Sequence, residues 1–326
     1  MKIRLLISCL LIFLINMINK DYLYTKVWED LSTVTLESDA LYLYAQDPED
    51  RSQHCSSNLS INNPNTLFEE ITINNFDQMV VSSNNFIVPL SSTDAISRFF
   101  SSYDFRVLYL EVTGMCCRLV APLMKYAILN GIETRVVYSE PKEYLLKEFQ
   151  KEGLHHDLSE SVAGVNPLPG FIHLVPFKEE PLFVTFLGFE GGRFTYLVMN
   201  KQPSYDKILP IVGVPGYRVH YPFESFWGNR NALKTTKSYE HVLYAEANSV
   251  VDSFLVLNRI SYDKREPNMI VAPIGTKPHA IGAILYAIKN PNRVELLYDN
   301  PRRSLHRTEG VGRILVCNVT KLFSEN

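Results

Sequence analysis

The sequence has few cysteines, and their placement excludes two common kinds of small-protein scaffold. The 326 residues include five cysteines, none of which forms a C-x-x-C pair. An odd, scattered set does not predict a disulfide framework, and a structural zinc site needs clustered Cys and His ligands. We therefore expect reduced thiols and no bound metal. The cysteines are Cys9, Cys55, Cys116, Cys117 and Cys317.

The sequence also lacks the short motifs that identify common enzyme classes. It contains no G-x-S-x-G nucleophile elbow and no H-E-x-x-H zinc motif. The segment Gly188–Arg193 is rich in glycine but fits neither the dinucleotide-binding pattern nor the Walker pattern, so we expect a hairpin turn there. No catalytic residue and no cofactor is assigned from motifs.

The sequence also lacks a large excess of acidic or of basic residues. The chain has 35 acidic and 32 basic residues, a net charge of −3. No global field favours nucleic acid, and we expect no direct DNA binding, although a local basic groove stays open. Hydrophobic residues make up 46% and charged residues 21%, which is typical of a soluble protein with a sizeable core.

The longest apolar run is short. It covers Leu5–Ile15 after two basic residues, whereas a membrane span needs about 20 apolar residues. Residues 3–18 are either a signal or membrane anchor or a buried helix, or else Met17 is the true start and residues 1–16 are a translation artefact. Because the thiols and the rest of the chain suit a cytoplasmic protein, we expect a cytoplasmic location.

Apolar runs alternate with amphipathic segments along the rest of the chain. Phe105–Val112, Cys116–Leu129 and Thr134–Tyr138 form a strand, helix and strand, which implies a parallel βαβ unit. Residues 53–66 are expected to be a loop, Glu143–Glu152 a charged helix, and Phe194–Val198 part of a hairpin or strand. Further strands are expected at Ala40–Ala45, Leu182–Leu187, Ile208–Gly213, Val242–Ala245, Met269–Pro273, Val294–Tyr298 and Arg313–Cys317, and further helices over 93–100, 247–260 and 278–289.

This alternation predicts an α/β fold with a Rossmann-like, doubly wound and mostly parallel sheet, in two halves. We expect an N-terminal apolar segment and polar lead-in over 1–38, a first Rossmann-like half over 39–160, and a second α/β half over 161–326.

Ligands of open α/β sheets bind where strands run into helices, and the sharpest such junction is Gly275-Thr276-Lys277. Gly275 allows close approach of the backbone, Thr276 suits a helix cap, and Lys277 adds positive charge at a helix start that already attracts anions. The residue types therefore suit a phosphate. A capped helix with a solvated lysine is the alternative.

Two further junctions have the same position in the first half. Thr113-Gly114 follows a strand, with Arg118 one turn into the helix, and we expect this loop to face the Gly275 loop across one crevice. Asp47 to Ser52 follows the first strand, where Asp47, Arg51 and Ser52 have groups that suit a ribose or base. Structural turns are the alternative at both positions.

The stretch Ile270–Ala283 resembles the late strand–helix motif of CARF domains, Rossmann-like sensors of cyclic oligoadenylates in CRISPR defence, and of the related SAVED domains. The resemblance implies that Gly275, Thr276 and Lys277 contact ligand phosphate or ribose, with Asp47–Ser52 near the same ligand. Pro273-Ile274 stands where those motifs have Thr-Gly.

The sequence contains no R-x-x-x-x-H ribonuclease motif and no recognisable output domain. The resemblance therefore implies a binding protein for a nucleotide or another phosphate-bearing small molecule, with an effector protein as partner and a homodimer as one possible assembly. An enzyme on the same fold, a phosphodiesterase or transferase, is the second reading. There Lys277 would stabilise phosphate charge and His279 or a carboxylate would transfer the proton. A non-catalytic scaffold is the third.

Overall fold

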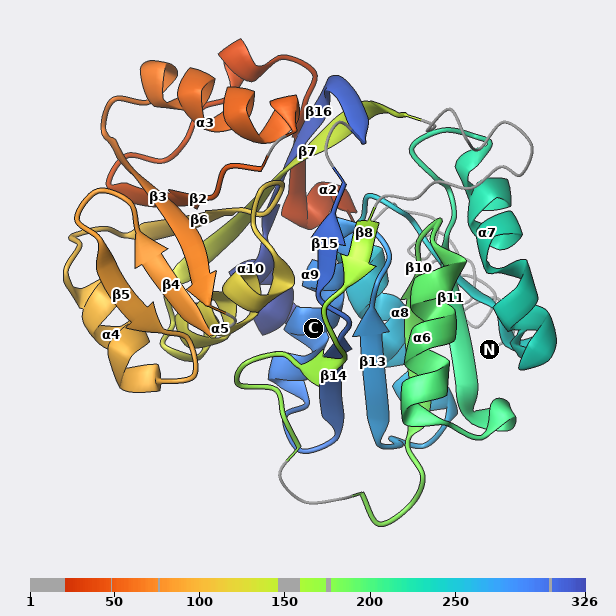
Figure 1. The fold of residues 1–326 in the computed structure, drawn as a ribbon. Coiled ribbons are helices and arrows are strands. Elements are labelled where there is room, and N and C mark those ends of the chain that lie inside the picture. Colours follow the sequence, from red (N-terminus) through yellow and green to blue (C-terminus); the bar gives the residue numbers. More distant parts are fainter. Residues whose placement is uncertain (1–20, 48, 76, 146–158, 174–176, 305–306) are drawn as a thin grey trace, which may run out of the picture.

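The chain folds into two α/β layers that lie side by side (Figure 1). The computed structural model describes residues 21–326 except 48, 76, 146–158, 174–176 and 305–306. The apolar N-terminal segment therefore lies outside the described residues. Each layer is built on one sheet, and helices cover both faces of each sheet.

The first sheet is mixed, with a parallel centre. Its eight strands are, in spatial order, β1 (Thr25–Trp28), β16 (Thr308–Asn318), β7 (Glu133–Tyr144), β6 (Val107–Glu111), β2 (Ala40–Tyr44), β3 (Thr66–Asn75), β4 (Gln78–Val81) and β5 (Phe86–Pro89). Strands β7, β6, β2 and β3 are parallel, and the others pair antiparallel. The last strand of the chain thus completes the first sheet.

The second sheet is parallel apart from one short edge strand. Its six strands are β12 (Leu243–Ala245), β11 (Ile208–Gly213), β10 (Leu182–Leu187), β13 (Met269–Pro273), β14 (Val294–Tyr298) and the antiparallel β9 (Asn166–Pro167). A separate ribbon pairs β15 (Pro301–Arg303) with β8 (Ser159–Val162).

One continuous apolar core joins the two layers. Leu123 of helix α5 (Cys117–Leu129) and Ile284 of helix α9 (Lys277–Lys289) are both buried in it, between the two sheets. The far face of the second sheet packs on α6 (Gly191–Lys201) and α7 (Tyr221–Thr235), and that of the first sheet on Leu59 of α3 (Asp50–Asn62). The helices are α2 (Asp21–Tyr24), α3 (Asp50–Asn62), α4 (Thr93–Ser101), α5 (Cys117–Leu129), α6 (Gly191–Lys201), α7 (Tyr221–Thr235), α8 (Val250–Asp263), α9 (Lys277–Lys289) and α10 (Val319–Glu325), with short 3₁₀ turns η1 (Leu31–Thr33), η3 (Tyr205–Lys207) and η4 (Ser238–His241).

Each sheet contains one point at which the chain reverses its direction of winding. In the second sheet the parallel strands follow the order 3-2-1-4-5 of their appearance in the chain, so the reversal lies between β10 and β13. In the first sheet the order is 2-1-3-4, and the reversal lies between β2 and β6. Such switch points open a crevice at the carboxyl ends of the strands, where ligands of this fold class bind.

The expected α/β class with a mostly parallel Rossmann-like sheet is confirmed. Four strands of the second sheet, β10, β11, β13 and β14, begin and end at the expected residues. The first sheet also takes up strands from outside residues 39–160, namely β1 and β16. Among the described residues there are two large sheets and the two-stranded ribbon, rather than one sheet.

Two segments differ from expectation because their local pattern was ambiguous. Residues 53–66 were expected to be a loop, yet most of them belong to helix α3, whose Leu59 is fully buried, so packing outweighs the low helix propensity of Ser and Asn. Phe194–Val198, expected to be a strand or hairpin, lies in helix α6, where Phe194 and Leu197 pack on the sheet at helical spacing.

The expected charged helix over Glu143–Glu152 is wrong at its start. Strand β7 continues to Tyr144, which pairs with Thr308 of β16, and residues 146–158 lie outside the described residues. The long β7–β16 pair arises because tertiary pairing outweighs local charge. Within the described ranges, no helix is long and apolar enough to span a membrane.

Candidate functional site

The loop at Gly275-Thr276-Lys277 lies at the switch point of the second sheet, between β13 and α9. Thr276 caps the helix: its hydroxyl accepts from the His279 N–H at 3.3 Å and donates to the Ala247 carbonyl at 2.5 Å. At Gly275, a Cβ atom would stand 2.9 Å from the His279 ring and 3.2 Å from the Leu187 carbonyl. The position therefore needs glycine, and the loop presents a helix N-terminus to the crevice.

His279 supports this loop from behind. Its ring is fully buried, and Nε2 lies 3.1 Å from the Glu246 carbonyl, which assigns the proton to that nitrogen. Burial lowers the pKa of His279 to about 4. The ring is therefore neutral at pH 7 and holds the loops that follow β12 and β13 together.

The glycine-rich loop after β10 lies at the same switch point. It opens helix α6, and a Cβ at Gly191 would stand only 1.9 Å from the Gly228 carbonyl of α7, so the two backbones touch. One turn into α6, Arg193 donates twice to the Asp299 carboxylate at 2.7 Å and once to the Ile274 carbonyl at 3.1 Å. Burial alone would lower the pKa of Arg193, but the pair with Asp299 outweighs it and raises that pKa.

The two loops at the switch point of the first sheet also touch. A Cβ at Gly114 would stand 1.7 Å from the Ala45 carbonyl, so only glycine lets the loop after β6 lie against the loop after β2. The backbone N–H groups of Thr113 and Gly114 donate to the Glu111 carboxylate at 3.1 and 3.4 Å. Burial raises the pKa of Glu111 to about 7, although these hydrogen bonds oppose the shift.

A buried ion cluster fixes the start of α3. The Glu49 carboxylate accepts from Arg51 at 2.5 Å, from the Thr308 hydroxyl at 3.0 Å, and from Arg307. Arg51 also donates to the Tyr138 hydroxyl at 3.1 Å and to the Ser139 carbonyl at 2.8 Å. The cluster joins the loop after β2 to β7 and to the start of β16.

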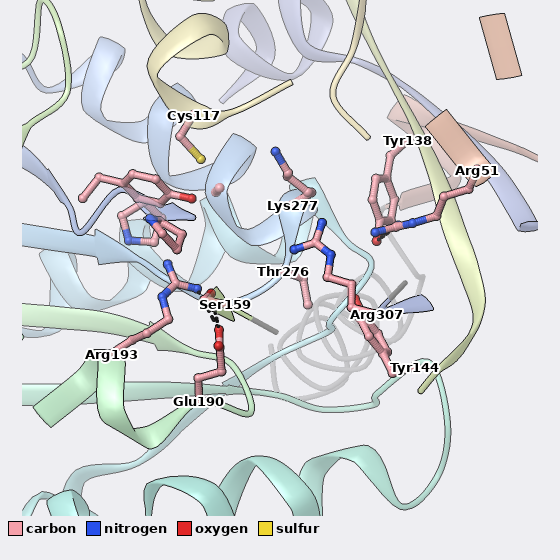
Figure 2. A pocket seen from close by; sticks show the side chains of 15 residues that line it. Arg51, Cys117, Tyr138, Tyr144, Ser159, Glu190, Arg193, Thr276, Lys277 and Arg307 are labelled. Atoms are coloured by element: carbon pink, nitrogen blue, oxygen red, sulfur yellow. Dashed lines mark hydrogen bonds and ion pairs between the residues drawn. The ribbon is translucent and has the colours of Figure 1, made fainter. Parts of the chain in front are cut away.

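The four loops meet across one cleft of about 590 Å³ (Figure 2). Lys277 bridges the layers, because its ammonium group donates to the Met115 carbonyl in the loop after β6. Figure 2 shows Arg193 on one side and Arg51 with Tyr138 on the opposite side, with Lys277 between them. The charged and aromatic side chains that line the cleft are Arg51, Arg193, Lys277, Arg307, Glu190, Tyr138, Tyr144 and Tyr298.

The residues predicted from the sequence fall into three groups. Arg51, Gly275, Thr276 and Lys277 line the cleft. Asp47, Ser52, Thr113, Gly114 and His279 build the loops from behind: the Ser52 hydroxyl bonds the Asp47 backbone, and that of Thr113 accepts from the Ser139 N–H. Arg118 instead pairs with Asp77, beyond the end of β3. The expected crevice between the Thr113 and Gly275 loops is present, although these loops belong to different sheets.

No family model and no curated protein matches the chain. Among solved structures, it is similar to a periplasmic ribose ABC transporter from Conexibacter woesei DSM 14684. The identity is 11%, the alignment covers 78% of this chain and 69% of that chain, and the TM-score is 0.23. A TM-score this low gives no information about the site.

Sequence reasoning missed Arg193, Arg307 and the three tyrosines of the cleft. Arg193 lies in the glycine-rich segment expected to be a hairpin. The overlooked signal was its position shortly after a buried strand, where a helix begins. Arg307 reaches the cleft only because β16 returns to the first sheet, which no local pattern shows.

The cleft contains one lining carboxylate among the residues described, that of Glu190, which accepts from the Ser159 hydroxyl at 3.1 Å. Over the same residues, no group of three or more His, Cys, Asp or Glu side chains is placed to hold a metal ion. The arrangement suits binding of an anionic ligand with flat, stackable parts.

Proposed function

We propose that this protein binds a phosphate-bearing nucleotide in the cleft and acts as a nucleotide sensor, as the resemblance of its Gly275-Thr276-Lys277 loop to CARF domains implies. One observation supports this most: the switch points of both sheets open into a single cleft whose wall holds four cationic side chains. Helix N-termini and basic side chains together favour phosphate.

The arginines are held so that part of each guanidinium group still faces the cleft. Arg193 uses three of its five N–H donors in the contacts to Asp299 and Ile274, and Arg51 uses three in its contacts with the first sheet. Their carboxylate partners sit behind them, so the remaining donors are oriented at little entropic cost. Such pre-organised groups suit charge-assisted hydrogen bonds to phosphate oxygens.

The tyrosines supply the complementary surface. Tyr138 comes from the middle of β7, and Tyr144 and Tyr298 come from the ends of β7 and β14; all three place rings beside the cations. A nucleotide offers both an anion and a stackable base, which match the cations and the rings that line the cleft. Cyclic oligonucleotides are the ligand class that the CARF resemblance implies, with an effector protein receiving the output.

An enzyme acting on the same nucleotide is the second candidate, and Glu190 is the observation that favours it. Its carboxylate lines the cleft within 3.6 Å of Arg193, where a general base would face a phosphate held by Lys277. His279 does not fill this role, because its ring is fully buried and is bonded to the Glu246 carbonyl.

Calorimetric titration tests the proposal. Cyclic di-, tri- and tetra-adenylate and ATP are titrated into the wild type, Lys277→Met and Lys289→Met, a matched lysine at the far end of α9. Because a charge-assisted hydrogen bond contributes about 1.5–3 kcal/mol, Lys277→Met should weaken binding about 10- to 100-fold, and Lys289→Met should leave it unchanged.

Product analysis of the same mixtures separates sensor from enzyme. An unchanged nucleotide recovered after binding supports the sensor, and turnover that is lost in Glu190→Gln supports the enzyme. If none of these nucleotides binds, or if binding is equal in Lys277→Met and the wild type, the cleft is not a nucleotide site.

A further inference from the structure

A second hollow, of about 470 Å³, adjoins the cleft. The two share Tyr144, Gly275 and Thr276 in their walls. The hollow lies at the carboxyl ends of β10 and β11, whose last residues line it, so it opens at the same edge of the second sheet. It is not part of the basic wall, because none of its described lining residues is charged.

Aromatic rings form one side of this hollow. Tyr144, Phe189 and Tyr221 pack in edge-to-face contacts, with ring centroids 5.2 to 5.7 Å apart. The Tyr221 hydroxyl accepts from the Tyr144 N–H at 3.1 Å. The Tyr217 hydroxyl donates to the Ala247 carbonyl at 3.2 Å and lies 3.2 Å from the Tyr138 hydroxyl. The wall therefore offers mainly ring surfaces.

Glycine backbone also lines the hollow, at Gly213 and Gly216. A Cβ at Gly213 would stand 2.9 Å from that of Ala247, and one at Gly216 would stand 3.0 Å from the Arg218 carbonyl. Side chains at these positions would displace their neighbours, so glycine lets the surrounding loops pack closely and leaves no side chain there to fill the hollow.

We infer that this second hollow receives the base of the nucleotide whose phosphate lies in the cleft. The inference rests on the proposed function and places the base in this hollow rather than against Tyr138 and Tyr298 of the cleft. Since ring stacking is tolerant of base identity, adenine and guanine nucleotides should bind with similar affinity. Phosphate contacts, not base hydrogen bonds, would then set the affinity.

Photolabelling locates the base directly. 8-Azidoadenosine triphosphate is irradiated with the wild-type protein, with and without excess ATP, and the labelled peptides are identified by mass spectrometry. We expect ATP-sensitive labelling of the segments around Phe189 or Tyr217–Tyr221. Specific labelling elsewhere overturns the inference, and so does the absence of ATP-sensitive labelling.

A matched pair of variants gives the second measurement. Phe189→Leu removes a ring from the hollow, and Phe223→Leu removes an exposed ring from α7 that does not line it. Phe189→Leu should weaken ATP binding about tenfold and leave inorganic triphosphate binding unchanged, whereas Phe223→Leu should change neither. Thermal melts confirm that both variants are folded.

These results keep the two claims apart. If ATP and triphosphate bind equally well to the wild type, or if Phe189→Leu weakens both alike, the base does not occupy the hollow. The proposed function is judged separately, by the loss of cyclic-nucleotide binding in Lys277→Met. Failure there removes both claims, while failure of the Phe189 comparison removes only the placement of the base.

Discussion

Replacing Arg193 by methionine should lower the free energy of unfolding by about 3–5 kcal/mol, because it removes one partner of a buried ion pair. Asp299 is fully buried and receives both of its hydrogen bonds to Arg193 at 2.7 Å. Methionine keeps most of the apolar volume, so packing changes little. The loss comes mainly from a carboxylate left without its cation, together with the freed Ile274 carbonyl.

Urea unfolding followed by circular dichroism measures this loss. Arg302→Met, an exposed arginine in the nearby β15, is the matched control and should change stability by less than about 0.5 kcal/mol. Adding Asp299→Asn to Arg193→Met removes the unpaired charge and should restore part of the stability. If Arg193→Met alone stays within about 0.5 kcal/mol of the wild type, the pair does not hold the cleft wall, and the argument for a pre-organised guanidinium group fails.

Two smaller perturbations test the loops around the cleft. Thr276→Ala removes the cap of α9 and should cost about 1 kcal/mol in a thermal melt, whereas Thr276→Ser should retain most of it; equal melting of all three proteins would contradict the cap. Burial raises the pKa of Glu111 to about 7, so the folded state holds a proton that the unfolded state releases near pH 4.5. This stabilisation, about 3 kcal/mol, is present below pH 4.5 and is lost as the pH rises through 7. Glu111→Gln should remove that pH dependence. The pKa of His279 is lowered to about 4, so its contribution to stability changes with pH in the opposite direction, and this contribution is the same in both proteins. Urea unfolding of the wild type and of Glu111→Gln at pH 5 and pH 8 measures this pH dependence. If the free energy of unfolding changes by the same amount between the two pH values in both proteins, the raised pKa of Glu111 is refuted.

The strands of the second sheet were predictable because they are buried on both faces. Leu182–Leu187 and Met269–Pro273 are short apolar runs bounded by polar or turn residues, and a parallel strand between two helical layers needs that pattern. The Gly275-Thr276-Lys277 loop was visible for a similar reason. Glycine, a capping hydroxyl and a lysine stand next to one another in the chain, so local chemistry reveals them.

Other parts of the site depend on contacts between distant segments, which local patterns do not contain. Glu49 and Arg307 are far apart in the chain, and they meet only because β16 pairs with β7 in the first sheet. In the sequence, Gly191 resembles a turn residue. In the fold it contacts α7, and its missing side chain lets the two helices touch. Local position was misleading for Arg118. Its place after a predicted loop suggested a ligand contact, but its side chain pairs with Asp77.

The charge of the cleft shows why composition alone could not find it. Four cations line the wall, yet Asp299 and Glu49 stand directly behind three of them, so the region adds little to the net charge of −3. An anion drawn to this cleft would respond to the direction of fixed N–H groups more than to a long-range field. The carboxylates thus reduce the net attraction for an anion, but they hold each guanidinium group in place. This arrangement favours a ligand whose oxygens match several fixed donors at once, which a phosphate group does better than a single carboxylate.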